Sequence, residues 1–300
     1  MADYRKYFDP LALARLAGAK LRSRRAVEGH MAGMHRSPLR GLSVEFAEHR
    51  EYSPGDDLRY VDWKVFGRSD KFYLKQYEEE TNLVCYFAVD TSASMGYRGP
   101  GAAMSKLEFA QRAVATLAYL VTRQQDSVAL ATFDAVVRQF VRPGRGAEHW
   151  RHVVESLEVT GDDRPTSIGP VLHLLAERFV DRGLVIVLSD LFDDVAKLIA
   201  GLKHLRHRRH DIIVLHVLDP AEVDFPFRRT TMFESVETDD EVLAHPAALR
   251  KAYLAEFGAF LSAVERGCRE LSVDHVVMRT DVPLADALAR FLAAREARSA

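Results

Sequence analysis

The chain has 300 residues, of which 48% are hydrophobic and 28% are charged, and its formal net charge is −2. This composition is typical of a globular protein with a sizeable core, and the near-neutral charge gives no reason to expect nucleic acid as a partner. The two cysteines exclude a disulfide framework, and no stretch approaches a membrane span of about 18 apolar residues. Because the N-terminus also lacks a signal-peptide apolar region, we expect a cytoplasmic protein with no membrane span.

Residues 1–80 are predicted to form an N-terminal attachment. A helix is expected near residues 10–26, followed by two half-exposed strands, because apolar and polar residues alternate on both sides of a Pro54-Gly55 turn. The alternating apolar residues are Leu42, Val44 and Phe46 in the first strand and Phe72 and Leu74 in the second.

Residues 81–300 are predicted to form the main domain, in which short apolar runs alternate with helical patterns. Nearly continuous apolar runs are typical of strands that are buried on both faces of a parallel sheet. Four such runs are Leu83–Val89, Val128–Phe133, Leu184–Leu188 and Ile212–Leu218. Val273–Met278 alternates more and is expected at an edge, and residues 134–141 are expected to form an antiparallel edge hairpin with the strand before them.

Amphipathic helices are predicted between these strands, and Ser105 with Glu108 predicts a capping box at the start of the first. The apolar stripes run over Leu107–Val121, Trp150–Leu157, Val171–Phe179, Val195–Leu205, Leu249–Cys268 and Leu284–Leu292. The alternation of strands and helices predicts an α/β fold with a doubly wound, mostly parallel sheet and right-handed crossovers.

A candidate metal site follows from where the polar residues stand. Ligands bind an open α/β sheet at the carboxyl ends of its strands, where the strand order reverses. The first strand runs into Asp90, Ser92 and Ser94, whose alternate side chains share one side of an extended loop. Thr166 precedes the third helix, and Asp190 follows the strand Leu184–Leu188. The alternative is an N-capping cluster at a strand-to-helix turn.

These residues have the chemistry of a site for a hard cation. Hydroxyl and carboxylate oxygens are the ligands that Mg²⁺ or Mn²⁺ prefers. Since few of the ligands carry charge, the ion would keep positive charge and attract an acidic side chain of a partner molecule. In order and context, Asp90, Ser92, Ser94, Thr166 and Asp190 resemble the metal-ion-dependent adhesion site of von Willebrand factor type A domains.

That resemblance implies a Rossmann-like fold and a role for each residue. The two serines would contact the metal, the threonine would complete the site, and the aspartates would often act through water. The sequence departs from many members of the family at Leu191, where they have glycine. This departure leaves the ligand set intact and changes the adjoining loop.

A second resemblance covers almost the whole chain. The stretch from Arg50 to Trp63, together with Glu45-Phe46, is similar to a bacterial family catalogued as domain of unknown function fifty-eight, which joins this signature to a type A-like domain. The resemblance implies a MoxR-type AAA+ ATPase as partner, in chaperone-like maturation or remodelling of a client protein. Many relatives carry membrane helices before the signature, and since the sequence printed here predicts none, the resemblance leaves membrane attachment an open question.

Arg59, Asp62 and Arg68 are singled out within the attachment. They are interpreted either as a buried ion-pair brace or as a recognition surface for a partner. The brace is favoured because aromatic side chains in the same stretch favour burial. These aromatic residues are Tyr60, Trp63 and Phe66.

The preferred function is a non-enzymatic, metal-dependent protein-binding module. A metal-dependent phosphatase-like hydrolase with Asp90 as nucleophile is an alternative, but that chemistry requires a second acid two residues later, where this chain has Ser92. A metal-independent interaction module is the third hypothesis. His204, His207 and His210 are interpreted as a basic helix C-terminus in preference to a metal site.

Overall fold

The structure is a computed structural model and describes residues 7, 10–16, 19, 21, 44–52, 61–69, 71–79, 83–158, 167–234 and 241–299. The chain divides into two units, Met1–Val27 with Leu83–Ala300, and Glu28–Asn82. This division differs from the predicted one, in which all of residues 1–80 form the attachment. The first residues group with the larger unit because Tyr7, Leu16 and Leu21 are buried in its apolar core.

The larger unit is built on a six-stranded sheet with the strand order β10-β7-β6-β3-β4-β5. All neighbouring strands are parallel except β4 and β5, which are antiparallel. In chain order the strands are β3 (Val84–Asp90), β4 (Ser127–Phe133), β5 (Val137–Gly144), β6 (Leu184–Ser189), β7 (Asp211–Leu218) and β10 (Asp274–Arg279). The predicted α/β class, the four buried strands, the edge position of the last strand and the antiparallel edge hairpin are confirmed.

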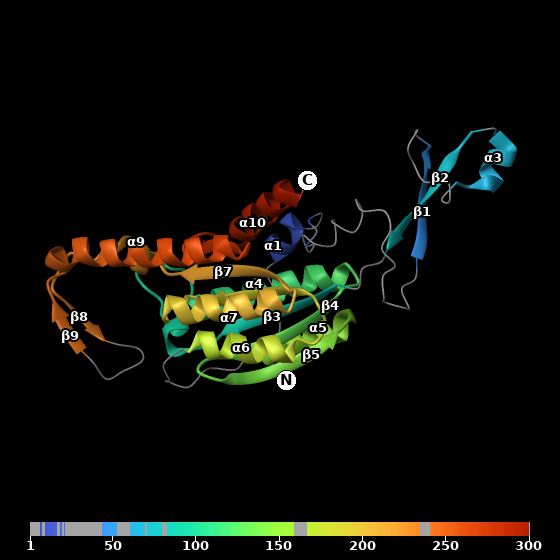
Figure 1. The fold of residues 1–300 in the computed structure, drawn as a ribbon. Coiled ribbons are helices and arrows are strands. Elements are labelled where there is room, and N and C mark those ends of the chain that lie inside the picture. The colour runs from blue at the N-terminus through green and yellow to red at the C-terminus, as the bar shows by residue number, and fades with distance from the viewer. Residues whose placement is uncertain are drawn as a thin grey trace. The chain divides into compact units, whose positions relative to one another are not determined.

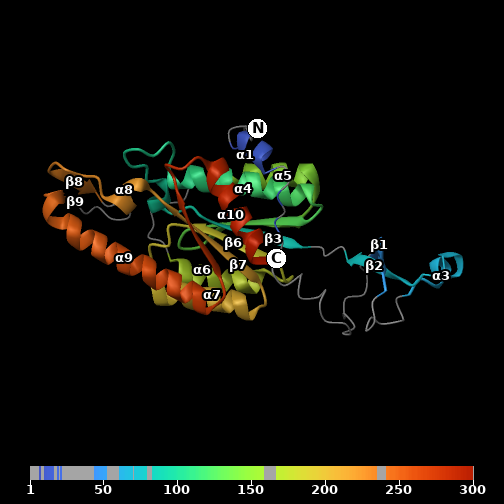
Figure 2. The ribbon, with the colours of Figure 1, turned by 90° about the horizontal axis from the view of Figure 1, so that it is seen from above.

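Helices cover both faces of this sheet (Figures 1 and 2). On one face lie α4 (Lys106–Arg123), α5 (Gly146–Glu155), α10 (Leu284–Ser299) and the short α1 (Pro10–Arg15), and on the other α6 (Ile168–Arg178), α7 (Val195–His207) and α9 (Pro246–Glu270). Side chains of a strand alternate between the two faces. In β3, Cys85, Phe87 and Val89 therefore enter one core, while Tyr86 and Ala88 enter the other.

The strand order reverses at β3. The chain places β4 and β5 on one side of β3 and then returns to place β6 on its other side. Because β3 and β6 are parallel, with Val89 opposite Leu188, their carboxyl ends lie next to each other. This is the position at which an open α/β sheet binds its ligands.

Short elements were not predicted. A 3-10 turn, η3 (Ala93–Gly96), follows β3, a second one, η4 (Ser156–Glu158), follows α5, and α8 (Pro220–Asp224) follows β7. The strands β8 (Thr231–Glu234) and β9 (Glu241–Ala244) form an antiparallel pair near the N-terminal end of α9, as Figure 1 shows. Phe225 stacks on Phe233 there, Phe227 packs edge-to-face against both rings, and Phe225 also packs on Tyr253 of α9.

The smaller unit contains the two predicted strands. They are β1 (Val44–Glu51) and β2 (Tyr73–Glu79), which pair antiparallel. A helix that was not predicted, α3 (Trp63–Ser69), lies between them. Phe66 of this helix stacks on Phe72, with ring centroids 4.4 Å apart. The predicted Pro54-Gly55 turn lies outside the described residues.

Candidate metal site

Asp90 is the last residue of β3, and its side chain is fully buried. Its Oδ1 accepts the backbone N–H of Ser92 at 3.0 Å, and its Oδ2 accepts the hydroxyl of Ser189 at 2.6 Å. Thr91 points the other way and donates to the carbonyl of Phe133 on β4. Alternate side chains of this loop therefore share a side, as predicted, and the carboxylate is fixed by one donor from each of two neighbouring strand ends.

The hydroxyls of Ser92 and Ser94 converge beside Asp90. Their Oγ atoms lie 3.2 Å apart, and the two side chains are almost fully buried. Two neighbouring ligands of an octahedral Mg²⁺ ion, each about 2.1 Å from the metal, lie roughly 3 Å apart. The serine pair therefore has the spacing of two adjacent metal ligands.

Asp190 follows β6 and is held by a lysine. Its Oδ2 accepts Lys106 Nζ at 2.8 Å, and its Oδ1 accepts the backbone N–H of Phe192 at 3.3 Å. Lys106 also donates to the carboxylate of Glu222, on α8. Both Lys106 and Asp190 have fully buried side chains. One ammonium group thus serves two carboxylates, and the Asp90 carboxylate is a third close by.

Three carboxylates, of Asp90, Asp190 and Glu222, lie near one ammonium group, so acidic groups outnumber the basic one here. Burial, followed by the charge of Asp190, raises the pKa of Asp90 to about 7, against the hydrogen bonds from Ser189 and Ser92. Burial also raises the pKa of Glu222, although Lys106 offsets part of the effect. Burial by itself would lower the pKa of Lys106, but the charges of Asp190 and Glu222 outweigh it and raise that pKa. A divalent cation would offset the excess charge.

The donor set fits a hard cation only if the hydroxyls take part. Among the described residues, no three His, Cys, Asp or Glu side chains are grouped so that they could hold a metal ion. Ser92, Ser94, Asp90 and Asp190 supply two hydroxyl and two carboxylate groups at the adjoining ends of β3 and β6. Oxygen donors of this kind are the ones that Mg²⁺ and Mn²⁺ prefer.

The loop after Asp190 has an unusual backbone. Leu191 has a φ of 59°, in the left-handed region, and its side chain is fully buried. That conformation costs a non-glycine residue about 1–2 kcal/mol, and burial of the leucine side chain in the core offsets the cost. The conformation explains why glycine suits this position in type A domains.

A family model described as "Protein of unknown function DUF58" matches residues 48–259. The chain belongs to this family. The match includes most of the predicted signature and every predicted metal ligand of this DUF58 protein. Uncharacterized proteins of Mycobacterium tuberculosis and Mycobacterium bovis are each 26% identical to it over 294 residues, which cover 96% of this chain and 90% of the relative.

Solved structures are also similar to this DUF58 protein. They include BatB from Bacteroides thetaiotaomicron (15% identity, 72% of this chain and 99% of that one, TM-score 0.45) and an aerotolerance-related membrane protein from Bacteroides fragilis (17%, 72% and 99%, TM-score 0.46). The SpRpn10 VWA domain is 14% identical and covers 69% of this chain and 94% of its own, with a TM-score of 0.41. At such scores, the type A-like architecture of this protein rests on its own strand order and antiparallel edge.

The structure describes four of the five metal ligands that were predicted from the sequence. Asp90, Ser92, Ser94 and Asp190 lie at adjoining strand ends, whereas Thr166 lies outside the described residues. Three residues of the site that sequence reasoning did not select as site residues are Ser189, Lys106 and Glu222. A signal was available for Lys106, because a lysine at the first position of a helix opposes the helix dipole.

The brace predicted for the smaller unit stays a prediction, because not all of its residues are described. Asp62 is buried, and its Oδ1 accepts the backbone N–H groups of Lys64 and Val65, so it caps α3. Arg68 is exposed in the last turn of α3, and Arg59 lies outside the described residues. Trp63, which was expected to be buried, is 60% exposed.

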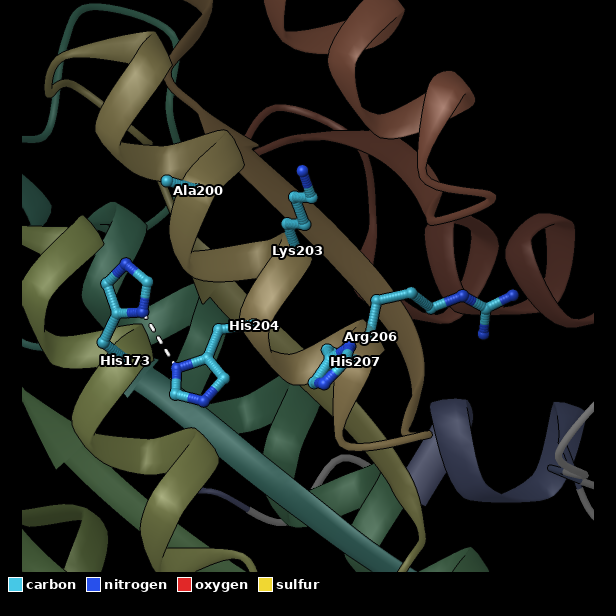
Figure 3. A pocket seen from close by; sticks show the side chains of 6 residues that line it. All are labelled: His173, Ala200, Lys203, His204, Arg206 and His207. Carbon is cyan, nitrogen blue, oxygen red and sulfur yellow. Dashed lines mark hydrogen bonds between the residues drawn. The ribbon is translucent and has the colours of Figure 1, made fainter.

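The histidines of α7 take part in a surface pocket that Figure 3 shows. His204 lies with its Nδ1 2.9 Å from Nδ1 of His173 on α6, and its Nε2 contacts Glu177. Basic side chains, Lys203 and Arg206 among them, line the pocket with these histidines. This setting supports the interpretation of a basic helix C-terminus. His210 does not line the pocket and is buried against Tyr86 and Phe179.

No helix among the described residues of this DUF58 protein has the length and hydropathy of a transmembrane span.

Proposed function

We propose that this chain is a non-enzymatic protein-binding module that uses a divalent cation, Mg²⁺ or Mn²⁺, as its docking point. Ser92 and Ser94 would contact the ion, with Thr166 completing the set and the two aspartates acting directly or through water. The observation that carries the proposal is the convergence of two hydroxyls and an excess of buried carboxylates at the switch point of the sheet.

The bound cation would attract an acidic side chain of the partner. Because two of the proposed ligands are neutral hydroxyls and the aspartates can act through water, the ion would keep part of its positive charge at an open coordination position. Arg98, which is exposed on the loop between η3 and α4, adds a positive charge four residues after Ser94. A Glu or Asp approaching this edge of the sheet would therefore meet a favourable potential.

A hydrolase is the weaker alternative. Each oxygen of Asp90 accepts a hydrogen bond, from Ser92 and from Ser189, which lowers the nucleophilicity of the carboxylate. The position where a general acid would stand carries Ser92, whose hydroxyl contacts Ser94. These contacts suit a fixed ligand better than a reacting group.

The partner that family resemblance suggests is a MoxR-type AAA+ ATPase, with this chain as an adaptor in the maturation or remodelling of a client protein. The test is binding of the purified chain to the MoxR-type ATPase of the same organism. Such an ATPase uses Mg²⁺ with its own nucleotide, so a chelator alone would not isolate the effect. The decisive comparison is therefore between variants, measured in constant Mg²⁺ and without nucleotide.

The test variant is Ser92→Ala with Ser94→Ala, which removes two ligands without changing formal charge. The matched control is Ser156→Ala with Ser262→Ala, because each of these exposed hydroxyls donates to a carbonyl four residues earlier in its own helical segment. Loss of one side of a desolvated charge pair costs about 2–5 kcal/mol, so the test variant should bind at least roughly thirtyfold more weakly. Equal binding by both folded variants would leave a metal-independent interaction module.

A further inference from the structure

The cation already present at this site is the side chain of Lys106. Its ammonium group is fully buried and donates to Asp190 Oδ2 at 2.8 Å and to the Glu222 carboxylate. The ring of Phe192 lies 4.9 Å away and adds a cation–π contact. Lys106 is therefore held on several sides at the edge of the candidate metal site.

The position of Lys106 is unfavourable for a structural lysine. It is the first residue of α4, after the N-cap Ser105. Helix dipoles favour anions at that end, and burial of an ammonium group is costly. Because neither helix formation nor core packing calls for a cation here, the two carboxylates account for its presence.

Glu222 holds the lysine in place. It is part of the capping box of α8, where its Oε2 accepts the backbone N–H of Asp219 while Oε1 faces Lys106. Tyr253 of α9 donates to the carbonyl of Glu222. Glu222 is thus fixed by the capping box of its own helix and by α9, so the ammonium group stays beside Asp190.

Lys106 and a divalent cation compete for the same carboxylate. Oδ1 of Asp190 already accepts the N–H of Phe192, and Oδ2 accepts Lys106. A cation at the serine pair that reaches Asp190, directly or through water, must share or displace one of these donors. If it shares Oδ2, two positive charges lie on one oxygen.

We propose that Lys106 is a positioning residue that withholds Asp190 from the divalent cation and thereby keeps the cation affinity of the site low. This inference rests on the proposed function, because it assumes that Ser92 and Ser94 hold the cation. A weak, readily exchanged ion is what a docking point needs if the partner's acidic side chain is to supply part of the binding.

The test is Mn²⁺ binding, measured by titration calorimetry and by the electron paramagnetic resonance of free Mn²⁺. The variant is Lys106→Met with Glu222→Gln, which removes one positive and one negative charge and strands no unpaired partner at Glu222. Net charge is unchanged, so a change in affinity reports on Asp190. We expect at least tenfold tighter binding, about 1.4 kcal/mol, and loss of this gain when Asp190→Asn is added.

The matched control is Arg269→Met with Glu265→Gln, an exposed ion pair on α9, which should bind Mn²⁺ like the native chain. A purely structural role of Lys106 would weaken binding, so the direction of the change discriminates. If the methionine variant does not fold, Lys106→Gln with Glu222→Gln provides a polar replacement with the same expected direction.

Each outcome decides a different claim. Equal or weaker Mn²⁺ binding by a folded variant overturns the role of Lys106 and leaves the proposed function standing. No binding by either chain overturns both. Tight binding by the variant alone supports the role of Lys106 and refutes metal dependence in the native protein.

Discussion

The larger unit contains two arginines that each bond two aspartates, one in buried and one in more exposed surroundings. Arg295 of α10 donates to Asp211 and Asp274, the first residues of β7 and β10, and all three side chains are only 4% exposed. Arg279 likewise bonds two aspartates, Asp224 and Asp281, but its side chain is 30% exposed. Replacement of each arginine by methionine tests how burial changes the contribution of an ion cluster to the free energy of unfolding.

Arg295→Met should be strongly destabilising. Methionine keeps much of the apolar stem but removes the guanidinium group from two buried carboxylates, and loss of one side of a buried ion pair costs about 3–5 kcal/mol. For a unit of this size, each kcal/mol lowers the melting temperature by about 2–4 °C, so a decrease of about 6–20 °C is expected. Arg279→Met removes an exposed cluster and should cost less than about 1 kcal/mol.

Urea denaturation of both variants at pH 7, followed by tryptophan fluorescence and circular dichroism, measures the difference. Addition of Asp211→Asn and Asp274→Asn to Arg295→Met should recover part of the loss, because the stranded charges are then removed. Equal losses for Arg295→Met and Arg279→Met would refute the reasoning that burial, and not the number of ion pairs, decides the cost.

Three further outcomes are expected. Mg²⁺ or Mn²⁺ at a hundred times its dissociation constant should stabilise the native chain by about 2.7 kcal/mol in thermal melts. The same metal should have no such effect on Asp90→Ala. Identical melts of the native chain with saturating metal and with chelator would argue against the site. Burial lowers the pKa of His210 to about 4, so the unfolded chain takes up a proton at this residue before the folded chain does, and stability is lost as pH falls from 6.5 to 4. In urea denaturation, the free energy of unfolding should fall by about 3 kcal/mol more between pH 7 and pH 4 in the native chain than in His210→Gln. Parallel losses in the two chains would contradict this. Cys85 and Cys268 are fully buried, and burial raises the pKa of both thiols, so a thiol reagent should modify them only in denaturant; rapid modification of the folded chain would be inconsistent with their burial.

The sequence by itself determined the elements of the sheet and the position of the candidate site. Continuous apolar runs and helical stripes are local patterns with periods of 2 and 3.6 residues, so they identified five of the six sheet strands closely and indicated the antiparallel hairpin. The placement of Asp90, Ser92 and Ser94 after a buried strand could also be predicted from the sequence, because the alternation of side chains along an extended loop depends only on the backbone.

Elements shorter than a periodic window escaped prediction. The helices α3 and α8 have seven and five residues, and β8 and β9 have four each. Stretches of this length contain too few repeats of a hydrophobic pattern to be distinguished from loops. They are stabilised by tertiary contacts, such as the packing of Phe225 on Tyr253.

Only the tertiary structure decided which charges meet. Lys106 lies 84 residues from Asp190 and 116 from Glu222, and Arg295 lies 84 residues from Asp211. No local pattern encodes such pairs, because they depend on the strand order and on which helix packs against which face. The docking of Leu16 and Leu21 into the core of the larger unit belongs to the same class. Backbone periodicity is a property of neighbouring residues, whereas the pairing of buried charges is a property of the assembled sheet and its helices.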